Sequence, residues 1–275
     1  MIKDITIGQY YPTGSPVHRL DPRFKMLELI AYIVFVFLCN SVASMIFLVA
    51  VTTAVLFVTG VPIVSYLKNL KSIWPIILLT AALNVFYIND GKLLLKWGVL
   101  QITYLGVRKA VFMALRIMLL IIASAVLTYT TTPNSLTDGL ESLMSPLKFI
   151  GLGTAVHTVA MMMTIALRFI PTLVDETDRL MNAQRARGAD FESGGIFKRV
   201  KALIPILIPL LVSSVRRALE LSEAMESRCY APSANRTRLK QLKFSSRDVA
   251  ALAITAISLS AVILLNKVPI VGLFI

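Results

Sequence analysis

Long hydrophobic runs dominate the first half of the chain and return once near its end. They cover residues 26–39, 42–60, 72–89, 110–130 and 249–265. A helix that crosses a bilayer needs about 20 largely apolar residues. The first run is shorter, so it extends into the residues before it, tilts, or forms a re-entrant hairpin with the second run. The pattern predicts an all-α polytopic membrane protein with about five transmembrane helices.

The middle of the chain follows a different pattern, in which the predicted helices carry a polar face. Residues 146–187 predict a helix that Pro171 interrupts, with Gly188 as the expected C-cap because glycine adopts a left-handed conformation most easily. Residues 196–228 predict a second long helix, which Pro232 stops. The segment therefore predicts a pair of long amphipathic helices.

Basic residues place this middle segment on the inner side of the membrane. The chain of 275 residues is 56% hydrophobic with a formal net charge of +13, and 16 of its 28 lysines and arginines lie between residues 133 and 247. Such a block suits nucleic acid or a cytoplasmic membrane face, and the flanking apolar runs favour the membrane face and no nucleic-acid partner. We therefore expect a cytoplasmic lead-in, transmembrane helices, a cytoplasmic domain and a C-terminal transmembrane helix, over residues 1–25, 26–132, 133–247 and 248–275.

Two shorter segments are open to more than one interpretation. Asp21-Pro22 predicts a helix start, with Asp as N-cap and Pro at the first helical position. The segment before it is either a plain cytoplasmic lead-in or a structured plug at the membrane surface. Residues 92–107 alternate weakly and predict an outer loop or a small hairpin.

The sequence offers no pattern typical of an enzyme, a cofactor site or a metal site. Walker A, HExxH and GxSxG patterns are absent, and the two cysteines, Cys39 and Cys229, lie far apart. Asp175, Glu176 and Asp178 cluster on a predicted helix, which is more typical of a solvated face than of a catalytic pair. We expect a non-catalytic chain with no cofactor.

The ends of the two long predicted helices can be overlaid on each other. Leu180, Ala183 and Arg187 match Leu221, Ala224 and Arg228 at an offset of 41 residues. Residues four and seven apart share one helix face, so each end presents an arginine in the same geometry. One such arginine is explained by the helix dipole. Two at matched offsets indicate a partner that is itself doubled, whose carboxylates each guanidinium can bind through two hydrogen bonds.

Methionines are frequent in the same segment. Met161, Met162, Met163, Met181 and Met225 lie on the two long helices. They either fill a core or form an adaptable surface, because the flexible thioether repacks against different partners. The second interpretation predicts a docking surface on the cytoplasmic side.

In its motifs the chain resembles the transmembrane (T) component of energy-coupling factor (ECF) transporters, ATP-driven importers of vitamins and metal ions that include the CbiQ-type cobalt transport proteins. The motifs run in order from His18-Arg19-Leu20-Asp21-Pro22-Arg23-Phe24-Lys25 through Arg168-Phe169-Ile170-Pro171 to the two arginine-bearing ends. The resemblance covers nearly the whole chain.

This resemblance implies long crossed coupling helices, each ending in an Ala-Arg-Gly motif that docks in a groove of one of two ABC-type ATPase subunits. The first motif is intact at Ala186-Arg187-Gly188, whereas the second reads Ser227-Arg228-Cys229. Cysteine adopts a left-handed cap less easily than glycine, so the geometry after Arg228 is in question. The unequal ends suit a heterodimer of ATPases.

The resemblance also implies a separate substrate-binding membrane subunit, the S component, that docks on the methionine-bearing helices and holds the vitamin or metal ion. The basic segment 236–247 would then hold the coupling region at the anionic inner leaflet of the bilayer. A self-contained secondary transporter or channel is the alternative, but it needs ionisable residues at midplane. The predicted spans offer only Glu28 and Arg116.

Overall fold

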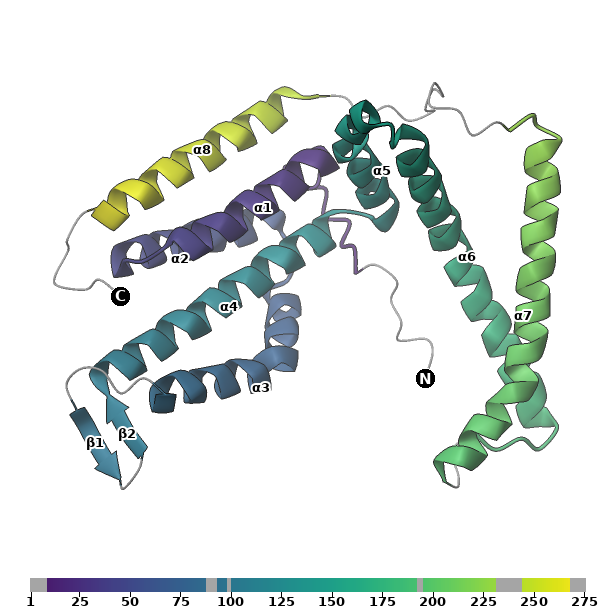
Figure 1. Ribbon diagram of the computed structural model, residues 1–275, viewed down its shortest axis with the longest axis horizontal. Helices are drawn as coiled ribbons and strands as arrows, with labels where there is room; N and C mark the ends of the chain where they lie inside the picture. Colours follow the sequence, from purple (N-terminus) through teal and green to yellow (C-terminus); the bar gives the residue numbers. More distant parts are fainter. Residues whose placement is uncertain (1–8, 88–92, 98–99, 192–194, 231–243, 268–275) are drawn as a thin grey trace. The chain divides into compact units, whose positions relative to one another are not determined.

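The computed structural model describes residues 9–87, 93–97, 100–191, 195–230 and 244–267, and within these ranges the chain is almost entirely α-helical (Figure 1). The elements in order are α1 (Pro22–Leu38), α2 (Val42–Thr59), α3 (Ile63–Tyr87), β1 (Leu93–Trp97), β2 (Leu100–Thr103), α4 (Tyr104–Thr130), α5 (Pro133–Leu143), a 3-10 helix (Ser145–Ile150), α6 (Gly153–Ala186), α7 (Ile196–Glu226) and α8 (Ser246–Lys267). Two compact units result, one of residues 8–139 and 240–275 and one of residues 1–7 and 140–239.

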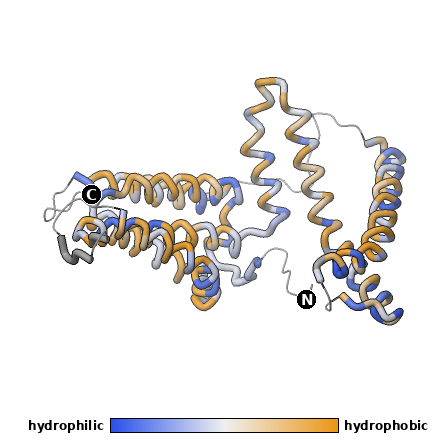
Figure 2. Tube along the Cα trace, turned by 60° about the horizontal axis from the view of Figure 1, so that its bottom comes forward, coloured by the Kyte–Doolittle hydropathy of each residue, from blue (hydrophilic) through white to orange (hydrophobic). Residues whose placement is uncertain are grey.

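Six of the described helices are long and apolar enough to cross a membrane, namely α2, α3, α4, α6, α7 from Phe197, and α8. Hydrophobic residues run along most of their length (Figure 2). The chain is therefore an all-α, multi-pass protein of the cell membrane, as the sequence predicts. The individual spans differ from the prediction, because α1 has only 17 residues and α6 and α7 meet the length and composition required.

The core of the first unit lies where α1, α2, α4 and α8 pack together. Its buried side chains are Phe35, Val36, Cys39, Met45, Leu48, Phe112, Leu119 and Val262. Burying such residues removes apolar area from water or lipid headgroups and fills the space between helices. A second cluster of Val61, Tyr66, Ala125 and Tyr129 joins α3 to α4.

Polar side chains from α4 and α8 hold the turn between α1 and α2. The Asn266 amide nitrogen donates to the Leu38 carbonyl (2.7 Å), and its oxygen accepts from the Ser44 hydroxyl (2.9 Å). The Arg116 guanidinium donates to the Cys39 carbonyl (2.9 Å) and lies 5.7 Å from the centroid of the Phe37 ring. Arg116 thus satisfies a free helix-end carbonyl and is a structural residue of this turn.

The described residues before α1 form a structured segment, which favours the plug over the plain lead-in. The amide of Tyr11 donates to the Tyr129 carbonyl (3.0 Å), and the Thr13 hydroxyl donates to the Thr59 carbonyl (2.8 Å). The segment therefore closes the ends of α2 and α4. Burial lowers the pKa of the His18 imidazole within it.

Two buried charged residues connect this segment to the helix ends. The Lys25 ammonium donates to the carbonyls of His18 (3.2 Å) and Thr130 (2.9 Å). The Asp248 carboxylate, 1% exposed, accepts from the amides of Asp21 (2.9 Å) and Ser245 (2.8 Å). The starts of α1 and α8 are therefore bonded to each other. The Asp21 side chain also accepts from the Arg23 amide (2.9 Å), as an N-cap should.

Several predicted boundaries are wrong. The helix α3 begins at Ile63 and not at residue 72, because Lys68 and Lys71 are exposed on its surface and do not end it. It bends along its length, as expected of a helix that contains Pro75 (Figure 1). Pro171 does not interrupt α6, since a proline removes one backbone donor while the flanking turns keep theirs.

The small hairpin predicted within residues 92–107 is present as the antiparallel pair β1 and β2.

Candidate functional site

The C-terminus of α6 ends in a left-handed cap that leaves Arg187 exposed. The Gly188 amide donates to the Arg185 carbonyl (2.9 Å), and the Ala189 amide donates to the Gln184 carbonyl (2.9 Å). Gly188 has a φ of +86°, and a Cβ at this position would meet nothing within 4 Å. This pair of bonds defines the Schellman motif, in which a glycine reverses the chain and satisfies the last carbonyls. Gly188 is therefore required for its backbone conformation and not for space.

The C-terminus of α7 has the same two backbone hydrogen bonds at its cap. The Cys229 amide donates to the Glu226 carbonyl (2.9 Å), and the Tyr230 amide donates to the Met225 carbonyl (3.0 Å). Cys229 has a φ of +52°, and it is the one residue other than glycine with a positive φ in the described chain. The geometry after Arg228, which the sequence left in question, is thus the same as after Arg187.

The two caps present their arginines in the same way. Arg187 and Arg228 are exposed, and neither guanidinium makes an ion pair or hydrogen bond with any described residue. Ala186, Gly188, Ser227 and Cys229 beside them are also exposed and small. Each helix end can therefore enter a groove with its guanidinium foremost and bind a carboxylate or another acceptor there.

A cysteine in the left-handed region is strained, and this strain is open to test. The left-handed conformation costs a residue with a Cβ about 1–2 kcal/mol. We expect Cys229→Gly to slow amide exchange in the last turn of α7 by about fivefold. Gly188→Ala should speed exchange in the last turn of α6 by a similar factor. Hydrogen exchange followed by mass spectrometry measures both, and unchanged rates in both variants would contradict the cap geometry.

An ion pair joins α6 to α7 at matching positions of the repeat. The Arg217 guanidinium bonds the Glu176 carboxylate, and both side chains are partly buried. These residues are 41 apart, which is the offset that also overlays Arg187 on Arg228. Figure 1 shows the two helices crossing. Contact between equivalent positions is the arrangement expected when two helices are related by a local approximate two-fold axis through the crossing.

The two arginine-bearing ends lie equally far from this crossing. Arg187 follows Glu176 by 11 residues, and Arg228 follows Arg217 by 11. At 1.5 Å per residue each arm is about 16 Å long. The sequence interpretation missed this pair because it treated Glu176 as part of a solvated acidic face. The shared offset of 41 residues is the signal that could have found it.

Two other titratable residues of the segment can be placed, His157 with a partner and Asp175 facing outward. The His157 imidazole contacts the Glu141 carboxylate at 3.1 Å, which joins α6 to α5. Asp175 is exposed on α6, beside the paired Glu176. Residues 236–243 of the predicted basic segment 236–247 lie outside the described residues.

The methionines are spread along the two helices and do not gather at one place. Met161, Met162 and Met163 are consecutive, so they point in three directions, and Met162 is 59% exposed. Met181 lies about 27 Å further along α6 by helical rise. Met225 is in the cap of α7, where its carbonyl accepts from Tyr230. Their part in docking a partner stays a prediction.

Of the helices α6 and α7, α7 has the larger exposed apolar surface. Ile206 is its one buried residue among those described. A row of exposed aliphatic side chains at four-residue spacing follows one face, formed by Leu207, Leu211, Val215 and Leu219, each more than half exposed. Apolar surface of this extent requires lipid or a protein partner to cover it.

Comparison with known proteins places these features in one family. Residues 13–239 match the family model of CbiQ, described as cobalt transport protein. The chain is 48% identical over 268 residues to the energy-coupling factor transporter transmembrane protein EcfT of Ruminiclostridium cellulolyticum, covering 98% of this chain and 99% of the relative. It is 49% identical to EcfT of Clostridium kluyveri, covering 98% of each chain, and 42% identical to EcfT of Bacillus subtilis, covering 92% and 94%. The chain therefore belongs to the CbiQ/EcfT family of transmembrane components of energy-coupling factor transporters.

Proposed function

We propose that this chain is the non-catalytic coupling subunit of an ATP-driven importer, which transmits the movement of two ABC-type ATPase subunits to a separate substrate-binding membrane subunit. The observation that carries the proposal is the pair of identical caps at equal distances from the crossing of α6 and α7. The names of the relatives, a cobalt transport protein and a transporter transmembrane protein, support the transport role.

The ATPase subunits dock at the two helix ends. Each cap offers one exposed guanidinium that has no partner among the residues that the structure describes and is flanked by small residues, which suits a carboxylate inside a groove. Two such ends about a local two-fold suit a partner made of two similar subunits. The intact Ala186-Arg187-Gly188 end and the Ser227-Arg228-Cys229 end differ in their side chains, which suits a heterodimer.

The crossing converts the ATPase movement into movement of the helices. When the two ATPases close on ATP, the two ends approach each other, and the partly buried Glu176–Arg217 pair keeps the helices in contact while their angle changes. This proposal places the segment 133–247 on the cytoplasmic face, where ATP is available. Every step is mechanical, so no catalytic residue is needed in this chain.

The substrate-binding subunit docks on the exposed apolar faces of α6 and α7. Leu207, Leu211 and the exposed Met162 offer this surface, and methionine adapts to more than one partner. The imported substrate, a vitamin or a metal ion, is held by that other subunit.

Co-purification of the full complex tests the docking proposal. We expect Arg187→Glu and Arg228→Glu each to reduce recovery of the ATPase pair about tenfold or more, because each places a carboxylate against a carboxylate. Arg179→Glu, which makes the same charge change on α6 away from the cap, is the control and should retain both ATPases. Full ATPase recovery by both cap variants would refute this docking mode.

A further inference from the structure

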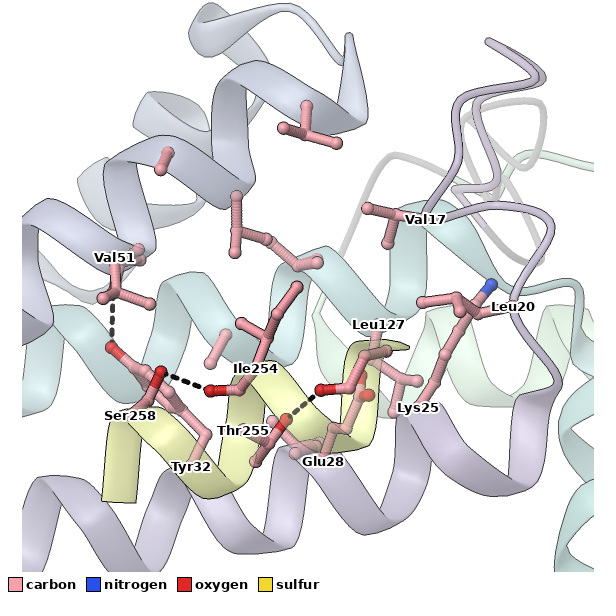
Figure 3. Close-up of a pocket in the computed structure, with 18 of the residues that line it drawn as sticks. Val17, Leu20, Lys25, Glu28, Tyr32, Val51, Leu127, Ile254, Thr255 and Ser258 are labelled. Atoms are coloured by element: carbon pink, nitrogen blue, oxygen red, sulfur yellow. Dashed lines mark hydrogen bonds between the residues drawn. The ribbon is translucent and has the colours of Figure 1, made fainter. Parts of the chain in front are cut away.

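A large apolar cavity lies within the first unit. It has a volume of about 610 Å³, is open on one side, and is lined by α1, α2, α4, α8 and the segment before α1 (Figure 3). Its walls are mainly aliphatic, with Leu29, Phe35, Leu48, Val51 and Ile254 among them. The volume lies in the range of sites that hold a drug-sized ligand.

The charged side chains of the cavity gather at one end. Lys25 and Glu28 come from the first two turns of α1, and Arg247 comes from the first turn of α8. The bond from the Asp21 amide to the Asp248 carboxylate keeps these two helix starts together. The opposite end is lined by Phe35 and by Tyr32 and Ser258, whose hydroxyls are uncharged and hydrogen-bonded within the protein, so the charged groups lie at one end of the cavity only.

The Glu28 carboxylate has one oppositely charged neighbour, the Lys25 ammonium, whose hydrogen bonds go elsewhere. The Lys25 ammonium is occupied by the carbonyls of His18 and Thr130. The Glu28 Oε1 atom is buried and has no hydrogen-bond partner, and Figure 3 shows this side chain beside Thr255 at the cavity. Arg247 is exposed, and its guanidinium makes no ion pair or hydrogen bond within the described part of the chain. A buried carboxylate oxygen without a donor is costly, so it points to a ligand that supplies one.

We propose that this cavity holds one acyl chain of a phosphatidylethanolamine molecule, whose ammonium binds Glu28 and whose phosphate binds Arg247. The aliphatic walls suit the acyl chain, because burial of methylene groups is favourable wherever they leave water. A carboxylate and a guanidinium at the polar end match the two opposite charges of this headgroup. Membrane-spanning helices around the cavity give a bilayer lipid direct access to it.

Native mass spectrometry of the full chain in mild detergent tests this proposal, with phosphatidylethanolamine and phosphatidylglycerol as the two probes. We expect one tightly retained phosphatidylethanolamine per chain and at least fivefold weaker retention of phosphatidylglycerol, which lacks the ammonium. Ala251→Phe fills the cavity wall and should weaken retention about tenfold or more. Ala253→Phe adds the same ring to an exposed position of α8 outside the lining and should leave retention unchanged.

The headgroup contacts have their own variants. Glu28→Gln and Arg247→Gln should each weaken phosphatidylethanolamine retention about tenfold, and Arg216→Gln on α7 is the matched arginine control. Equal retention of the two lipids would overturn the proposal. Equal retention by the Ala251→Phe and Ala253→Phe variants would also overturn it, because the lipid would then lie outside the cavity.

Discussion

We expect substrate uptake to fall to background when Arg187 and Arg228 are both replaced by glutamate. Both side chains are exposed at the tips of 11-residue arms beyond the crossing of α6 and α7, and neither has a partner in the described chain. Their replacement should therefore leave the helices intact while it reverses the charge offered to the proposed ATPase partners. A reversed charge against a carboxylate costs several kcal/mol. Uptake of radiolabelled substrate into cells or proteoliposomes that contain the complete transporter measures the effect.

The control for this experiment makes the same charge change elsewhere on the same helices. Arg179 and Arg216 are exposed on α6 and α7 but lie outside the caps. The Arg179→Glu/Arg216→Glu variant should keep most of the uptake. Membrane levels of both variants are compared by immunoblot. Wild-type uptake by the Arg187→Glu/Arg228→Glu variant would refute the role of the two arginines.

Reversing one charge at the helix crossing should uncouple ATP hydrolysis from transport. Arg217→Glu places two carboxylates together at a partly buried contact between α6 and α7, so we expect the helices to separate at the crossing through which the proposed movement would pass. We expect the substrate transported per ATP hydrolysed to fall about tenfold or more, with hydrolysis itself retained. Transport and phosphate release in the same proteoliposomes give this ratio.

A charge swap distinguishes the ion pair from any other effect of the single change. The Glu176→Arg/Arg217→Glu variant restores an attractive pair in the opposite sense and should recover the transport ratio to within about twofold, as a double-mutant cycle requires of a direct interaction. Arg216→Glu, at the exposed neighbouring position, is the matched control. If the swapped variant transports no better than Arg217→Glu, the pair does not act as a unit.

The membrane helices were predictable because each depends on a local pattern. Runs of apolar residues define α2 and α8 to within a few residues, and Asp21-Pro22 defines the start of α1. The start of α4 was predicted six residues too late, because Tyr104 lies in the segment predicted as a loop or hairpin. The errors arose where charge or proline overrode that pattern. The apolar run begins only at residue 72, whereas α3 begins at Ile63 and contains Lys68 and Lys71, and Pro171 lies inside α6 without ending it.

Only part of the candidate site could be predicted from the sequence. The repeated Leu, Ala and Arg positions identified both helix ends, because a helix converts spacing into a shared face. The conformation of Cys229 was not predictable, since it depends on bonds from the Cys229 and Tyr230 amides that overcome its preference. The contacts of Lys25 with Thr130 and of Asp248 with Asp21 join residues more than 100 positions apart, and no local pattern encodes such pairs.

Site-specific photo-crosslinking tests the central claim most directly. A photoreactive amino acid at Ala183, and separately at Ala224, occupies equivalent exposed positions one turn before each cap and keeps both arginines. In the complete complex, each position should crosslink to an ATPase subunit, and the same probe at exposed Ala166 on α6 should not. Crosslinks from both cap positions to the ATPases are the result we predict. Properly inserted chains whose probes at Ala183 and Ala224 never label an ATPase subunit would contradict the docking of the two helix ends.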